Sequence, residues 1–132
     1  MDSTKIIEEF RANNGKVGGM FSGMNLLLMT TIGAKSGKES VIPVAYTKDG
    51  ENFVVVASKG GAPTNPAWYY NLIAHPEIKV EVGSEKFQVH AVNTTGEERE
   101  RLFNQHAAIY PNFNDYKAKT TREIPVLTLE RI

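Results

Sequence analysis

Apolar residues in this chain fall mainly into short runs that are separated by glycine-rich or polar turns. Six of these runs predict strands, because they are either continuously apolar or alternate between apolar and polar positions. They span residues 25–31, 41–46, 53–58, 77–82, 86–92 and 124–129. Most follow one another directly, and the Asp49-Gly50 pair is typical of a tight turn between strands. The pattern therefore predicts hairpins and a mainly antiparallel sheet.

Helical spacing of apolar residues predicts three or four helices around these strands. The segments are 3–13, 66–74, 95–109 and, after Pro111, a shorter one at 112–119. Asn65 is expected to be the N-cap of the second, with Pro66 at its first helical position. Thr95 and Glu98 have the spacing of a capping box at the start of the third.

The order of these elements predicts an α+β protein, mainly β, built as a small six-stranded antiparallel barrel with peripheral helices. A parallel Rossmann sheet is not expected, because helices do not alternate with strands and no G-x-G-x-x-G motif occurs. We divide the chain into an N-terminal helix with a glycine-rich connector, 1–24, and a barrel, 25–132. The connector contains Met20, Phe21 and Met24, so part of it is expected to cover a site.

Composition narrows the classes of function. The 132 residues suit one domain with its own core, and 15 Lys+Arg balance 15 Asp+Glu, which argues against a broad nucleic-acid surface. The absence of cysteine excludes disulfides and thiolate metal sites. With no secretory signal or membrane-spanning run, a cytoplasmic protein is expected. The amphipathic segment 3–13 packs on the domain in our interpretation, with peripheral membrane contact as the alternative.

Two loops carry groups that suit a phosphate. Residues 33–38, Gly-Ala-Lys-Ser-Gly-Lys, join the first two strands and offer backbone N–H groups, a hydroxyl and two ammonium groups. Taken alone, this loop is better interpreted as a solvated hairpin turn. Residues 58–61, Ser-Lys-Gly-Gly, repeat the chemistry after another strand and lead to a helix N-terminus. Together the loops predict a cradle for a phosphorylated planar ligand.

Metal and nucleophilic chemistry have little support in the sequence. His75, His90 and His106 lack the spacing of a helical zinc pair, so we expect structural or surface roles and predict no metal site. No G-x-S-x-G nucleophile motif occurs either.

Two groups of aromatic residues are candidates for a ligand pocket. Tyr110, Phe113 and Tyr116 recur every third residue, and the pattern fits either core packing or a lid over an apolar pocket. Residues 68–70, Trp-Tyr-Tyr, pose the same question. We expect at least one of these three in the core, and another could line a flat ring.

Four segments resemble the deazaflavin-dependent nitroreductase family, in the same order and over about 27–130. They are TTIGAKSGKESVIPVAY, VVVASKGGAPTNPAWYYNL, AHPEIKVEVG and YPNFNDYKAKTTREIPVLTLE. The resemblance implies a split β-barrel related to flavin-mononucleotide (FMN)-binding split barrels. It also implies that the protein binds the deazaflavin coenzyme F420 and transfers hydride from its reduced form to quinones, nitroaromatics or similar small acceptors. Barrels of this kind often form homodimers through exposed strands.

The resemblance also assigns roles by position. Residues implied to contact the coenzyme are Ala34, Lys35, Ser36, Ser40, Val41, Ile42, Pro43, Val44, Ala45, Val56, Ala57, Ser58, Lys59, Ala67, Trp68, Tyr69, Tyr70, Asn71 and Phe113. Of these, Lys35 and Ser36 would hold the phosphate and glutamyl tail. The predicted catalytic residues are Ser58, Tyr110 and Tyr116, because a hydroxyl such as Ser58 or Tyr116 could donate to an acceptor oxygen that gains charge.

The chain departs from the family pattern at three positions. The family usually has arginines where this chain has Ala34 and Ser40, and a tyrosine where it has Ala45. The loss of two cations is expected to weaken binding of an anionic tail by about tenfold or more, with Lys38 compensating in part. An FMN-dependent oxidoreductase therefore stays open as an alternative, as does a non-catalytic barrel that binds a cofactor or lipid.

Overall fold

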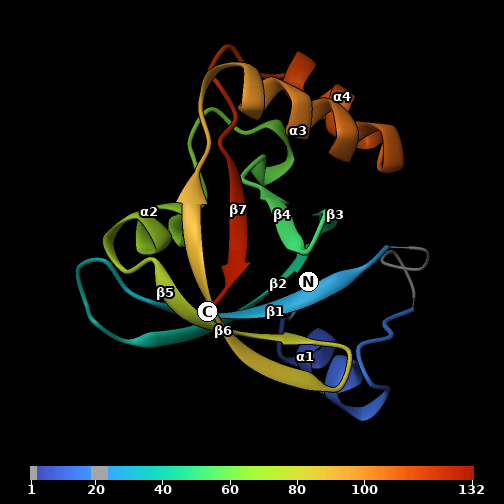
Figure 1. The fold of residues 1–132 in the computed structure, drawn as a ribbon, viewed down its shortest axis with the longest axis vertical. Helices are drawn as coiled ribbons and strands as arrows, with labels where there is room; N and C mark the ends of the chain where they lie inside the picture. Colours follow the sequence, from blue (N-terminus) through green and yellow to red (C-terminus); the bar gives the residue numbers. More distant parts are fainter. Residues whose placement is uncertain (1–2, 19–23) are drawn as a thin grey trace.

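The computed structural model describes residues 3–18 and 24–132 (Figure 1). Its strands are β1 Leu26–Ile32, β2 Glu39–Ala45, β3 Thr47–Asp49, β4 Asn52–Val56, β5 Glu77–Val82, β6 Glu85–Asn93 and β7 Val126–Arg131. Its helices are α1 Ser3–Ala12, α2 Ala67–Ala74, α3 Gly96–Ile109 and α4 Asn112–Ala118, with a 3-10 turn, η2, at Lys59–Gly61. Of the predicted connector, residues 19–23, which include Met20 and Phe21, lie outside the described residues.

The strands form one antiparallel sheet in the order β2-β1-β5-β6-β7-β4-β3. The two edge strands, β2 and β3, are separated in the chain by Tyr46 alone. The sheet must therefore curl until its edges approach one another, which makes the predicted split barrel (Figure 1).

The predicted strand count was too low by one. Beyond the six predicted strands, the structure adds β3, which pairs with β4 across the predicted turn at Gly50, with Asp49 opposite Asn52. The prediction missed β3 because three residues are too few for an alternating pattern to be visible.

The continuous apolar runs are explained by burial on both faces of the sheet. In β1, Leu27 and Met29 face the interior of the curled sheet, and Leu26 and Leu28 lie under α1. In β4 the outer face carries Val54, which packs against α3 and α4. Strand β5 alternates between exposed and buried residues from Glu77 to Val80, because its second face is covered only further along, at Glu81.

Helix α1 packs on the sheet, as the main interpretation of segment 3–13 expected. Ile6 and Phe10 are buried against the outer face of β1. Arg11 donates two hydrogen bonds to Glu81, at 3.1 and 2.8 Å, and these hold the pKa of that carboxyl below its usual value. The alternative of peripheral membrane contact through this helix has no support, because its apolar residues are already buried.

Two predicted helix starts need correction. The N-cap of α2 is Pro66, not Asn65, because the Asn65 side chain bonds to Arg122 and Tyr70 instead. Thr95 is the N-cap of α3, as predicted, but its side chain makes no capping hydrogen bond. Gly96 follows with φ 61°, outside the helical region, so the first turn lacks the geometry of a capping box.

Candidate functional site

A cavity of about 600 Å³ opens between the β1–β2 turn and the start of α2. It is lined by Gly33, Ala34, Lys35, Ser36, Lys38, Ser40, Ala67, Tyr70 and Asn71. All but Gly33 and Lys38 were predicted to contact the coenzyme. The fold thus brings residues from two separate sequence motifs to one place, which we call the turn cavity.

The turn itself is held by short-range hydrogen bonds. The Gly33 N–H donates to the Lys38 carbonyl at 2.8 Å, and the Gly37 N–H donates to the Gly33 carbonyl at 3.0 Å. A Cβ on Gly33 would overlap the Ser36 hydroxyl, so any larger residue there would displace that side chain. The Ser36 hydroxyl accepts a bond from the Lys38 N–H at 3.2 Å. Its own proton therefore stays available for an anion.

The turn cavity carries positive charge without a compensating acid. Lys35 and Lys38 are exposed, and neither forms an ion pair with any residue in the described part of the chain. No Asp or Glu within the described ranges contributes to the lining. These features fit an anionic ligand such as a phosphate or a carboxylate tail.

Asn71 joins α2 to this turn. Its side-chain oxygen accepts a hydrogen bond from the Ala34 N–H at 3.0 Å, and its side-chain nitrogen donates to Thr31 at 3.4 Å. Both ends of the amide are thus engaged within the protein. Asn71 lines the turn cavity as predicted, and its visible role is to fix the position of the turn.

A second group of predicted residues follows β4. Val56, Ala57 and Ser58 are buried, whereas Lys59 is exposed, with φ 48° and its ammonium group 3.3 Å from the Thr64 hydroxyl. The Ser58 hydroxyl makes no hydrogen bond to another described residue, so it remains free to donate to a ligand.

The predicted residues on β2 lie on an edge strand. Residues 41–45, Val41, Ile42, Pro43, Val44 and Ala45, are all half-buried, and β2 pairs only with β1. Such a strand can present a half-open apolar surface to a flat ligand or to a second protein chain. Ala45, at the position of the family tyrosine, packs against the same core cluster as Tyr116 and Met24.

The three aromatic residues at the start of α2 divide between core and surface. Trp68 and Tyr69 are half-buried and pack against the interior of the sheet, away from the lining of the turn cavity. Tyr70 is 52% exposed and lines that cavity. The expectation that at least one packs in the core is confirmed.

The residues predicted as an aromatic lid form a cluster with His106, which we call the aromatic cluster: His106, Tyr110, Phe113 and Tyr116. Ring centroids of Phe113 lie 4.5 Å from His106 and 5.2 Å from Tyr116. Tyr110 and Phe113 are buried under α3 and α4, and Tyr116 is half-buried. Core packing therefore describes Tyr110 and Phe113, while Tyr116 keeps an accessible edge.

The two predicted catalytic tyrosines have different hydrogen bonds. The Tyr110 hydroxyl donates to the Tyr46 carbonyl at 2.9 Å and accepts from the Asn25 N–H at 3.1 Å. The Tyr116 hydroxyl accepts from the Asn112 side chain at 2.8 Å, which leaves its own proton free. The catalytic role of both residues stays a prediction, and the geometry favours Tyr116 as a donor.

His106 is the most perturbed titratable group in the aromatic cluster. Its Nδ1 lies 2.9 Å from the Thr47 hydroxyl, and its Nε2 is buried without a partner. Burial lowers the pKa of His106 to about 4, so the ring is neutral at pH 7. The predicted structural role of this histidine agrees with its position.

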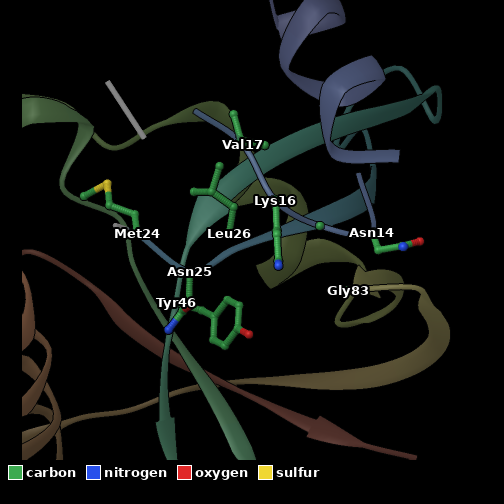
Figure 2. Close-up of a pocket in the computed structure, with 9 residues that line it drawn as sticks. Asn14, Lys16, Val17, Met24, Asn25, Leu26, Tyr46 and Gly83 are labelled. Atoms are coloured by element: carbon green, nitrogen blue, oxygen red, sulfur yellow. The ribbon is translucent and has the colours of Figure 1, made fainter. Parts of the chain in front are cut away.

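A second cavity, of about 390 Å³, lies at the other end of the β1–β2 hairpin (Figure 2). Lys16, Met24 and Tyr46 contribute to its lining, which includes no residue that was predicted to contact the coenzyme. Tyr110 connects this region with the aromatic cluster through its bonds to Asn25 and Tyr46.

The described residues, 3–18 and 24–132, contain no group of three or more His, Cys, Asp or Glu side chains placed to hold a metal ion. No helix formed by them is long and apolar enough to cross a membrane.

The curled sheet and the turn cavity define this protein as a split β-barrel with a cationic cavity beside a helix N-terminus. Comparison with known proteins then identifies the family. The chain belongs to the F420H(2)-dependent quinone reductase family, whose sequence model matches residues 4–131.

Similar proteins cover most of this chain. It is 37% identical over 129 residues to an F420H(2)-dependent quinone reductase of Mycobacterium tuberculosis, covering 92% of this chain and 85% of the relative. A solved F420-H2 dependent reductase is 39% identical, with a TM-score of 0.73, and the match covers 80% of this chain and 93% of that one. A solved structure described as a domain-swapped dimer is 34% identical, with a TM-score of 0.75 and 98% of both chains covered.

The sequence interpretation left two lining residues outside the assigned site. Lys38 is one of the two ammonium groups that suit a phosphate in the 33–38 loop, but it was not assigned to the coenzyme site, and it lines the turn cavity directly. Gly33 also lines it. Their spacing in the Gly-Ala-Lys-Ser-Gly-Lys turn was the available signal, because a tight turn brings all of its residues close together.

Proposed function

We propose that this protein transfers hydride from reduced coenzyme F420 to a quinone. The observation that carries the proposal is the turn cavity, which offers two unpaired lysines and a free hydroxyl in a chain of the F420H(2)-dependent quinone reductase family. Nitroaromatic compounds form a second acceptor class for the same assay.

The residues of the turn cavity fit the coenzyme's anionic tail. Lys35 and Lys38 would attract its phosphate and carboxylates, and Ser36 would donate a hydrogen bond. The N-terminus of α2 borders the same space through Ala67, and its free N–H groups add a favourable field. When bound, the coenzyme supplies the hydride chemistry. The protein then needs to position and orient the coenzyme and the acceptor, and to exclude water.

Stabilisation of the acceptor falls to hydroxyl donors. A quinone oxygen gains negative charge as it is reduced, and a donor placed beforehand lowers the barrier. Ser58 and Tyr116 are the two candidates whose hydroxyl protons are not used inside the protein. Tyr110 is a weaker candidate, since its proton is held by the Tyr46 carbonyl.

We further propose that the protein forms a homodimer. The solved structure described as a domain-swapped dimer covers 98% of this chain. Strand β2 is a half-buried sheet edge that could contribute to such an interface. Light scattering coupled to size-exclusion chromatography tests this directly, with a mass of 14.6 kDa contradicting the dimer.

Cofactor titration is the first test of the proposed function. Purified protein is titrated separately with F420 and with FMN at two salt concentrations, following fluorescence of Trp68, the single tryptophan. We expect salt-sensitive binding of F420, because the contacts to its tail are ionic. Preference for FMN would keep the fold and overturn the cofactor, and binding of neither would indicate a non-catalytic barrel.

Turnover is then measured with reduced F420 and a soluble naphthoquinone. We expect Ser58→Ala and Tyr116→Phe each to lower kcat by about tenfold or more, because each removes a donor to the reduced oxygen. If neither substitution changes turnover, the assignment of these hydroxyls is wrong.

A further inference from the structure

One arginine from the C-terminal part of the chain holds the loop between β4 and α2. Through its guanidinium group, Arg122 donates to the Ser58 carbonyl at 2.8 Å, the Ala62 carbonyl at 2.9 Å and the Asn65 side-chain oxygen at 2.7 Å. A longer bond of 3.3 Å reaches the Ala57 carbonyl. All three guanidinium nitrogens therefore contact residues 57–65, which we call the clamped loop.

The clamped loop needs such a donor because its own backbone is irregular. Lys59, Gly60 and Gly61 have φ values of 48°, 64° and 83°, which no regular helix or strand contains. Carbonyl groups in such a segment have few regular backbone partners. Arg122 supplies several donors from one rigid plane, and burial lowers its pKa while leaving it charged at neutral pH.

Both ends of the clamped loop reach the proposed site. One end is Ser58, whose carbonyl Arg122 binds and whose hydroxyl is the candidate donor to the acceptor. The other end is Asn65, whose side-chain nitrogen lies 3.4 Å from the Tyr70 hydroxyl, and Tyr70 lines the turn cavity. Arg122 itself does not line that cavity.

The clamped loop also lies against α4. A Cβ on Gly61 would come within 2.8 Å of the Tyr116 carbonyl and 2.9 Å of the Lys119 Cβ. The loop therefore contacts both Arg122 and the helix that carries Tyr116. Movement of this loop would change the position of Ser58 relative to Tyr116.

We propose that Arg122 is a positioning residue, which holds Ser58 and the start of α2 in the arrangement that binds coenzyme and acceptor. This inference rests on the proposed function. Lysine cannot replace it, because one ammonium group cannot reach carbonyls on both sides of the loop in fixed directions.

The test compares Arg122→Lys and Arg122→Ala with a matched control, Arg99→Gln. Arg99 likewise bonds to backbone and is more deeply buried than Arg122, with Nε and Nη2 at 3.0 and 2.7 Å from the Ile124 carbonyl, but it does not contact the clamped loop. Hydrogen exchange of the coenzyme-free proteins, the Kd for F420, and kcat and KM for the quinone are measured for each variant.

Both Arg122 variants are expected to show faster exchange within 57–66, with little change in β1 or β5. Their Kd for F420 should rise about tenfold, and millimolar guanidinium should restore part of the lost affinity to Arg122→Ala and not to Arg122→Lys. Arg99→Gln should lower the melting temperature without a local change in 57–66 or in Kd.

Two results would overturn the inference about Arg122 and leave the proposed function in place. One is wild-type affinity for F420 in both Arg122 variants, and the other is an Arg99→Gln protein that matches them in local exchange and in Kd. Failure of wild-type protein to bind F420 is a different outcome, because it would overturn the proposed function and the assignment of Arg122 to its site together.

Discussion

The turn cavity and the aromatic cluster are built in opposite ways, although sequence patterns assigned both to one site. The turn cavity is lined mainly by exposed small and cationic residues of a tight turn, together with residues of α2, and its lysines have no ion partner among the described residues. The aromatic cluster consists of three buried rings and the half-buried Tyr116, with polar atoms that are mostly engaged within the protein. Figure 1 shows α3 and α4, which carry the cluster, together at one end of the sheet.

The difference predicts separable effects of substitution. Changes in the turn cavity should alter ligand affinity with little effect on stability, because exposed side chains contribute little to folding. Changes in the aromatic cluster should alter stability first. The four predictions below test that division, beginning with the largest expected effect.

Phe113→Ala should lower the free energy of unfolding by about 3–5 kcal/mol, because it removes a buried ring in contact with three others. Lys35→Ala is the matched change in the turn cavity and should stay within about 0.5 kcal/mol of wild type. Urea denaturation measures both. Similar losses in the two variants would contradict the division between the regions.

The free energy of unfolding should fall as the pH decreases from 6.5 to 4, because His106 binds its proton less readily in the folded protein than in the unfolded chain. Its pKa is lowered to about 4 in the folded protein, so the unfolded chain binds more protons in this interval. The shift of this pKa from its ordinary value of 6.5 corresponds to roughly 3 kcal/mol in the free energy of unfolding. This stability is fully present above pH 6.5 and is lost as the pH falls to 4. Denaturation midpoints of wild type and His106→Gln across this range give the measurement. Parallel pH profiles for the two proteins would show that His106 does not titrate as described.

Tyr110→Phe should cost about 1–2 kcal/mol of stability, because it leaves the Tyr46 carbonyl and the Asn25 N–H without their partner. Tyr116→Phe should cost less stability, because its hydrogen-bond partner, the Asn112 side chain, is half-buried and can bond to water instead. Thermal unfolding compares the two. If Tyr116→Phe is the more destabilising change, the aromatic cluster extends further into the core than we infer.

Restoring the family arginines with Ala34→Arg and Ser40→Arg together should tighten F420 binding by about tenfold, or roughly 1.4 kcal/mol. Both positions line the turn cavity, where added cations would face an anionic tail. Ser84→Arg adds one arginine on the β5–β6 turn, away from this cavity, and should leave the Kd unchanged. The gain should shrink at high salt. An equal gain from Ser84→Arg would indicate a general effect of charge.

Local pattern predicted most of the secondary structure and part of the site. The strands at β5 and β6 were visible because alternation reports which side chains face water, and the Leu-rich β1 was visible as an apolar run. The 33–38 turn was also visible, since the properties of a six-residue turn lie in its own glycines and lysines.

Contacts between distant segments could not be predicted in this way. Asn65 resembles an N-cap in sequence, and only its bond to Arg122, 57 residues away, removes it from that role. Tyr110 and Tyr116, six residues apart, look equivalent in the sequence. In the structure the Tyr46 carbonyl accepts the hydroxyl proton of Tyr110 and not that of Tyr116.

The sequence by itself determined that this chain folds as a small antiparallel barrel and that its turns carry the glycines, hydroxyls and lysines from which we predict an anion site. Those properties depend on neighbours along the chain, where backbone preference and the period of burial act. The tertiary structure alone decided which side chains are free to act on a ligand. Each polar group accepts or donates a limited number of hydrogen bonds, and curling of the sheet brings together the distant partners that use them.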